Sequence, residues 1–98
     1  MKKYILLYKG PATPPGAPHE KWPAWFAKLG EDLVDRGSPM SNGFALHSDG
    51  SESDAASSLN GYSIIQAEDR KAAKKMVKDH PYLALAGDKY RVEVFELE

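Results

Sequence analysis

The chain lacks cysteine altogether, and it also lacks long apolar runs and an excess of positive charge. The absence of cysteine excludes disulfide bonds, thiolate catalysis and cysteine-based zinc sites. Its 13 lysines and arginines are balanced by 14 acidic residues, whereas a nucleic-acid-binding protein would usually carry a basic excess. Because apolar runs extend over only a few residues, we expect no membrane-spanning or secretory segment. These features predict a cytoplasmic protein without a nucleic-acid or membrane partner.

The motifs of common metal and cofactor sites are also missing. The three histidines form neither an HxH nor an HxxxH pattern, which would place two imidazoles near one metal ion. The sequence contains no glycine-rich phosphate-loop motif and no motif of a serine nucleophile elbow. We therefore predict no metal site and no cofactor.

What the chain does contain is a pair of terminal strands, residues 2–8 and 90–97, that are apolar on both faces. Successive side chains in a strand point to opposite faces of the sheet. One face of the first strand thus carries Tyr4, Leu6 and Tyr8. The other carries Ile5 and Leu7. A single layer of helices can cover only one face of the sheet. The second apolar face would then be exposed to water, and we therefore predict that it associates with a second copy of the chain.

Two helices are expected from the spacing of apolar side chains. The first begins near residues 19–21 and carries an apolar stripe made of Trp22, Trp25, Phe26, Leu29, Leu33 and Val34. The second extends from about residue 69 to residue 79, with apolar positions on one side and lysines on the rest of its circumference. Pro81 is expected to end it, because proline disfavours helical backbone at the preceding residue.

Two more strands are predicted, at residues 44–47 and 61–66, and the small polar residues 48–58 between them predict a mobile hairpin tip. The order strand, helix, strand, strand, helix, strand is that of the ferredoxin-like split βαβ fold. We therefore predict one α+β domain over residues 1–98, with both helices on one face of a four-stranded antiparallel sheet.

Several segments taken together resemble one protein family over nearly the whole chain. They are residues 1–10 (MKKYILLYKG), 25–30 (WFAKLG), 60–65 (NGYSII), 80–83 (HPYL) and 90–94 (YRVEV). In order and spacing they are similar to YCII-related proteins. This resemblance implies a dimeric α+β barrel, in which two ferredoxin-like sheets pack face to face.

The resemblance also implies two kinds of function. Some family members resemble dehydrochlorinases of hydroxylated chloroaromatics, and others accompany sigma-factor-like regulators. A His–Asp pair proposed as an acid–base couple occurs in some members, with the histidine early in the first helix. In this chain His19 lies closest to that position, and Asp32 or Asp35 is the candidate carboxylate. His80 also matches a family position.

The histidines have alternative interpretations from the residues themselves. Histidine is the natural general base near neutral pH, so His19 and His80 are candidate catalytic residues. The alternatives are a surface position near a helix start for His19 and a capping or packing role for His80, which falls on the apolar stripe of the second helix.

Aromatic side chains are the candidate ligand contacts. Tyrosine and tryptophan offer a stacking surface together with a directed hydrogen bond, which suits a small planar ligand. The candidates are Tyr8, Trp22, Tyr62 and Tyr82.

Three hypotheses follow for the function. The first in order is a homodimeric small-molecule-binding or accessory protein. The second is a small-molecule enzyme of the lyase or dehydrochlorinase kind that uses a His–Asp pair. The third is a structural or interaction module, which would have no cavity of about 300 Å³ or more.

Overall fold

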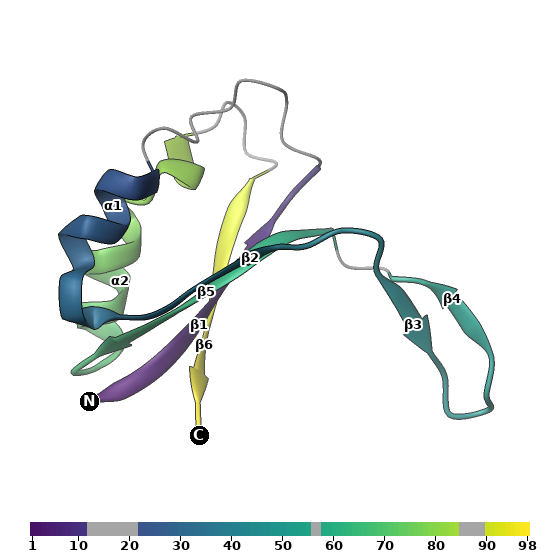
Figure 1. The fold of residues 1–98 in the computed structure, drawn as a ribbon. Coiled ribbons are helices and arrows are strands. Elements are labelled where there is room, and N and C mark those ends of the chain that lie inside the picture. Colours follow the sequence, from purple (N-terminus) through teal and green to yellow (C-terminus); the bar gives the residue numbers. More distant parts are fainter. Residues whose placement is uncertain (12–21, 56–57, 85–89) are drawn as a thin grey trace.

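Two helices lie on one face of a four-stranded antiparallel sheet (Figure 1). The computed structural model describes residues 1–11, 22–55, 58–84 and 90–98. The sheet contains β1 (Lys2–Lys9), β2 (Leu33–Pro39), β5 (Leu59–Ala67) and β6 (Arg91–Leu97), in the order β2-β5-β1-β6. This order and the helices α1 (Trp22–Leu29) and α2 (Arg70–Lys78) agree with a ferredoxin-like α+β fold.

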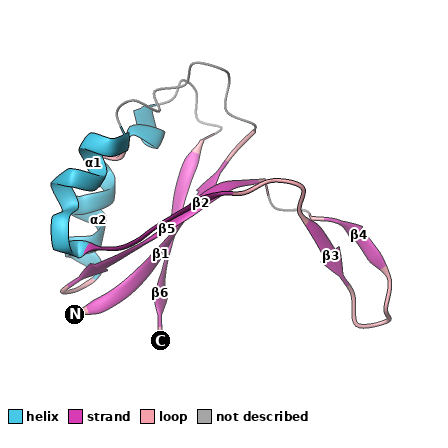
Figure 2. Ribbon diagram, viewed as in Figure 1, coloured by secondary structure: helices cyan, strands magenta, loops and turns pink. Residues whose placement is uncertain are grey.

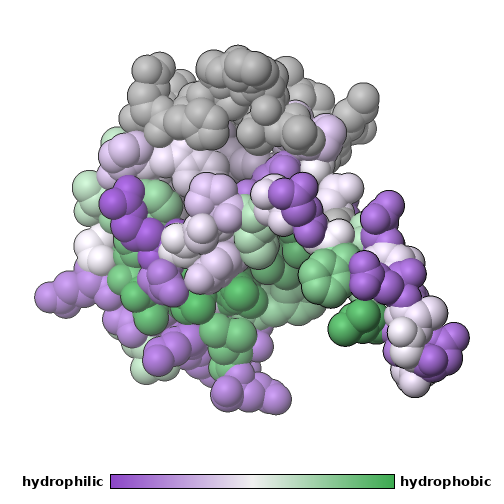
Figure 3. Space-filling view, turned by 45° about the vertical axis from the view of Figure 1, so that its right-hand side comes forward, coloured by the Kyte–Doolittle hydropathy of each residue, from purple (hydrophilic) through white to green (hydrophobic). Residues whose placement is uncertain are grey.

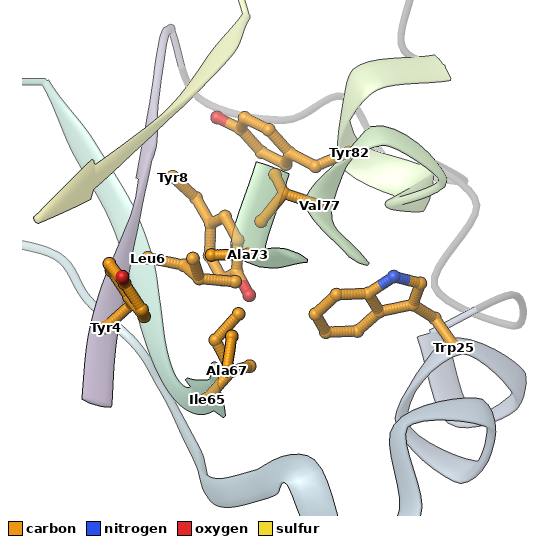
Figure 4. Packing of buried hydrophobic residues seen from close by; sticks show 9 residues of the cluster. All are labelled: Tyr4, Leu6, Tyr8, Trp25, Ile65, Ala67, Ala73, Val77 and Tyr82. Carbon is orange, nitrogen blue, oxygen red and sulfur yellow. The ribbon is translucent and has the colours of Figure 1, made fainter. Parts of the chain in front are cut away.

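The core lies between the sheet and the helices, and β1 shows how the sequence builds it (Figure 4). Burial alternates along this strand as its sequence predicts. Tyr4, Leu6 and Tyr8 are buried on the helix side, whereas Ile5 and Leu7 are only partly buried on the other side. The expected alternation of faces is therefore confirmed for this strand.

The first helix is shorter than its apolar stripe predicts. It ends at Leu29, and a 3-10 turn, η2 (Gly30–Asp32), leads directly into β2. Gly30 has a φ angle of +55°, a left-handed conformation that glycine adopts easily and that ends helices. The prediction that Leu33 and Val34 continue the helix was wrong: both lie in β2, which pairs with β5.

The second strand of the sheet is consequently β2 and not the predicted segment at residues 44–47. That segment does form a strand, β3 (Phe44–Leu46), but it pairs with β4 (Glu52–Asp54) in a separate two-stranded hairpin. The hairpin projects away from the main sheet (Figure 2). Its turn lies within the predicted tip, residues 48–58, of which residues 56–57 are outside the described part.

The second helix matches its prediction closely. Asp69 caps its N-terminus by accepting a hydrogen bond from the backbone N–H of Ala72 at 2.8 Å. The helix ends before His80, and a 3-10 turn, η3 (Pro81–Ala84), follows. Pro81 fits this change because its ring is incompatible with a continuing helix.

The described helices leave the opposite side of the sheet uncovered (Figure 1). Ile5 pairs across the sheet with Ile64 on β5 and with Phe95 on β6, so these three side chains lie side by side on this open face. Phe95 is 53% exposed and Leu97 is 39% exposed. Apolar side chains gather in this region next to the hairpin (Figure 3).

Candidate functional site

His80 lies among aromatic rings immediately after helix α2. Its side chain is 2% exposed. The centroid of its ring lies 4.1 Å from that of Trp25, 4.7 Å from that of Trp22 and 4.8 Å from that of Tyr8. The end of α2 at this point therefore places an imidazole inside the core, between helix α1 and strand β1.

Hydrogen bonds determine which nitrogen of this imidazole carries the proton. The backbone N–H of Tyr82 donates to Nδ1 of His80 at 2.9 Å, so this nitrogen is an acceptor. A neutral imidazole then holds its proton on Nε2, which lies 3.0 Å from the hydroxyl oxygen of Tyr8. We assign Nε2 as the donor to Tyr8 on this basis.

The chain of hydrogen bonds continues across the sheet. The hydroxyl of Tyr8 donates to Oγ of Ser63 at 2.7 Å, and the hydroxyl of Ser63 donates to the backbone carbonyl of Arg36 at 2.7 Å. Each hydroxyl thus accepts one hydrogen bond and donates another, which satisfies these buried groups. The chain links the end of α2 to β1, β5 and the edge strand β2.

Burial shifts the protonation equilibria of both rings in this chain. Removal from water penalises the charged imidazolium and lowers the pKa of His80 to about 3. The same effect raises the pKa of Tyr8 to about 12, against a smaller opposing contribution from the hydrogen bond with Ser63. Near neutral pH, His80 is therefore uncharged and Tyr8 keeps its proton. With these protonation states the hydrogen bonds of the chain can form, and they hold the two rings in place.

A cavity of about 520 Å³ lies beside this chain, bounded by α1, β2, β5 and η3. Its volume falls within the range of small-molecule sites, about 300–1,000 Å³. Aromatic side chains make up much of the wall, namely Tyr8, Trp22, Phe26, Tyr62 and Tyr82. The other lining residues are Arg36, Gly37, Ser38, Pro39, Asn60 and Gly61. The wall therefore offers flat apolar surfaces and a few polar groups.

Several aromatic rings of the wall contact one another, either edge-on or tilted. Trp22 meets Tyr8 with ring centroids 5.0 Å apart and an angle of 79° between the ring planes. Tyr8 also lies 5.3 Å from Tyr82. Such offset and edge-to-face contacts are the favoured geometry of aromatic pairs. These ring contacts help to hold the wall in place.

Two polar side chains of the wall have distinct environments. The amide nitrogen of Asn60 lies 2.9 Å from both the hydroxyl oxygen of Tyr82 and the carbonyl oxygen of Pro11, so it ties η3 to the end of β1. The guanidinium carbon of Arg36 lies 4.7 Å from the ring centroid of Phe26. This distance is typical of a cation–π contact. Asn60 is therefore a structural tie, whereas Arg36 brings a positive charge to the wall.

The four aromatic residues predicted to contact a ligand come together in the structure. Tyr8, Trp22, Tyr62 and Tyr82 all line this one cavity, although they come from four different elements. Ligand binding by these residues stays a prediction. His80 packs against two of these rings from the core side, so its side chain supports the wall.

The predicted catalytic residues are not assembled in the same way. His19 lies outside the described residues. Asp32 is the last residue of η2, and Asp35 lies in β2, where its carboxylate accepts a hydrogen bond from the backbone N–H of Gly37 at 2.8 Å. Neither aspartate is among the described residues that line the cavity. Both ring nitrogens of His80 are engaged by Tyr82 and Tyr8, and neither of these partners is a carboxylate.

The sequence analysis missed Arg36, Asn60 and Ser63. Arg36 was not recognised because the first helix was expected to continue through Leu33 and Val34, whereas the structure places Arg36 in the middle of β2. Ser63 stands at a strand position that alternation marks as buried, and a buried hydroxyl needs a hydrogen-bond partner, which was an available signal. Asn60 carried no comparable signal, because its partners lie far away in the sequence.

Comparison with known protein families gives one match. The family model described as YCII-related domain matches residues 1–98, the whole chain. No curated protein and no solved structure matches the chain. Within the described residues, no group of three metal-ligating side chains occurs. The helices of this part of the chain are also too short or too polar to cross a bilayer.

Proposed function

We propose that this chain, which belongs to the YCII-related family, is a homodimeric protein that binds a small planar molecule in the cavity between α1, β2 and η3. The observation that carries the proposal is the wall of the cavity. Five of its lining side chains are aromatic, and four of these contact one another ring to ring, namely Tyr8, Trp22, Phe26 and Tyr82. Aromatic surfaces that pack against one another favour a flat ligand because stacking adds to the burial of apolar area.

The described histidines favour ligand binding over acid–base catalysis, because their rings are held in hydrogen bonds within the protein and do not line the cavity. His80 is uncharged near neutral pH, with both ring nitrogens in hydrogen bonds inside the protein. The other described histidine, His47, lies on the projecting hairpin and is bonded to Ser53 at 2.8 Å. A general base must reach the proton that it removes from a bound molecule. Neither side chain lines the cavity.

The homodimer is supported by the open face of the sheet. Ile5, Ile64 and Phe95 form a row across three of its four strands, β5, β1 and β6, and Phe95 is about half exposed. A contiguous apolar surface of this kind is usually an interaction site in a water-soluble protein. A twofold axis would allow the same row on two copies to meet, as in the face-to-face barrel that the family implies.

The first prediction concerns the aromatic wall. The change Trp22→Leu is expected to weaken binding of the uncharged probe 2-naphthamide by about tenfold, because one stacking surface is lost. Binding is measured as chemical-shift changes in a two-dimensional NMR titration. Shifts in the native protein are expected at residues of the cavity wall.

The matched control is Phe44→Leu, the same kind of truncation on the hairpin. Phe44 is 63% exposed and does not line the cavity, so its variant is expected to bind the probe as the native protein does. If Trp22→Leu binds 2-naphthamide as tightly as the native protein does, or if the native protein binds no planar aromatic probe at millimolar concentration, the proposed function is wrong.

A second prediction concerns the dimer. The change Phe95→Lys is expected to weaken self-association by at least about a hundredfold, since it would bury a charge between two apolar faces. Sedimentation velocity at micromolar concentration is expected to show a dimer for the native protein and a monomer for the variant. The control is Leu83→Lys on η3, which lies on the helix side and is 43% exposed, and which is expected to remain dimeric. A monomeric native protein would contradict the proposal.

A further inference from the structure

Arg36 is the one charged side chain among the described residues that line the cavity. It belongs to the edge strand β2, and its guanidinium lies over the ring of Phe26, which also lines the cavity. The positive charge is therefore placed against the same aromatic wall that is proposed to stack with the ligand.

This guanidinium has no carboxylate partner within the described part of the chain. The ion pairs there involve Lys2, Lys9, Lys28 and Arg91. The acidic neighbour of Arg36 in the sequence, Asp35, accepts a hydrogen bond from the backbone N–H of Gly37. A guanidinium has five N–H donors, and the face-on contact with Phe26 uses none of them as a hydrogen bond. Donors of Arg36 are thus available to a bound molecule.

The rest of the described wall does not oppose a negative charge. Its lining residues include no aspartate or glutamate. The buried tyrosines of the wall, Tyr8 and Tyr82, and His80 behind it are all uncharged near neutral pH, because burial raises the pKa of each tyrosine and lowers the pKa of the histidine. An anion entering the cavity would meet one positive charge and no repulsion from these residues.

We infer that the ligand is a planar monoanion, an aromatic carboxylate whose carboxyl group pairs with Arg36 while its ring lies against the aromatic wall. This inference rests on the proposed function, because it names the class of molecule that the same cavity would take. Arginine matches a carboxylate with two parallel hydrogen bonds, and a single arginine balances a single negative charge. The other wall residues provide the apolar contact.

The test compares two probes of the same size and shape, 2-naphthoate and its uncharged amide, 2-naphthamide. The native protein is expected to bind the carboxylate about tenfold more tightly than the amide. In Arg36→Gln this preference is expected to disappear, because binding of the carboxylate should weaken more than binding of the amide. The control Arg70→Gln removes an exposed arginine on α2, outside the cavity, and should keep the preference.

A measurement on the native protein alone complements the variants. Raising the salt concentration from 20 to 500 mM should weaken binding of 2-naphthoate severalfold, because salt screens an ion pair with an exposed arginine, and should leave 2-naphthamide unchanged. Equal binding of the two probes, or a preference that survives Arg36→Gln, would overturn this inference while leaving the proposed function standing. Failure of both probes to bind would overturn both.

Discussion

Replacing Gly37 by alanine is expected to lower the free energy of unfolding by about 3–5 kcal/mol, a large part of the stability of a small domain. Gly37 lies in β2 with a φ angle of +77°, in the left-handed region that residues with a side chain avoid. A β-carbon here would also overlap the backbone carbonyl of Tyr62 on β5. The variant must therefore push β2 away from its partner strand.

Gly30 provides a matched control for this prediction. Its φ angle is +55°, but a β-carbon there would meet no other atom within 4 Å. Gly30→Ala should therefore lose only about 1–2 kcal/mol, the cost of the left-handed backbone alone. Both variants are compared by urea denaturation at one protein concentration, since dimerisation would make stability depend on concentration. Equal losses in the two variants would show that the contact of Gly37 with β5 is unimportant.

The change Gly37→Ala is also expected to alter the cavity. Gly37 lines it, and the carbonyl of the preceding residue, Arg36, ends the hydrogen-bond chain that begins at His80. If β2 moves, the guanidinium of Arg36 moves with it. Any folded fraction of the variant should therefore bind 2-naphthoate more weakly than the native protein.

Acidification is expected to destabilise the protein through His80. Burial lowers the pKa of this side chain to about 3, whereas an imidazole in the unfolded chain has a pKa near 6.5. Between these values the unfolded state binds a proton that the folded state does not, so stability falls as the pH falls. The full contribution is present above pH 6.5, and about 2–3 kcal/mol is lost between pH 7 and pH 4.5.

The measurement is the free energy of unfolding from urea titrations at several pH values between 7 and 5, where most carboxylates stay ionised. His80→Gln should flatten the dependence on pH in this range. His47→Gln, on the exposed hairpin, should keep the native slope. NMR titration of the folded native protein gives an independent result. A His80 ring that gains a proton near pH 6.5 without unfolding would contradict the prediction.

Local patterns in the sequence were enough to predict several parts of the fold. The alternation along residues 2–8 correctly separated the side chains of β1 into two faces, and the structure decided which of them the helices bury. The apolar spacing before Pro81 located α2 to within one residue of its observed bounds. Both signals succeed because burial repeats with the geometric period of a strand or a helix.

The same kind of signal failed at the start of β2. Leu33 and Val34 continue the apolar spacing of the first helix, and nothing local distinguishes a helix surface from an edge strand at these positions. The structure ends the helix at Gly30 and uses the following residues to pair with β5. Pairing with a strand some thirty residues away decided the outcome, and this also placed Arg36 on the cavity.

The aromatic site was predicted only in part. Tyr8, Trp22, Tyr62 and Tyr82 were chosen for their chemistry, and the structure places all four around one cavity. The sequence could not show that His80 would sit behind them with a neutral ring. That state follows from burial of the ring, and the groups around it include Tyr8, which is 72 residues away.

By itself, the sequence determined the two faces of the inner strands, the position of the second helix and the family to which the chain belongs. Only the tertiary structure decided which segment forms the edge strand, where the cavity lies and which groups His80 contacts. The physical reason is the range of the interactions. The burial pattern of a helix or strand can be predicted from residues that are close together in the sequence. Strand pairing and the hydrogen bonds of buried side chains instead join residues that only the folded chain brings together.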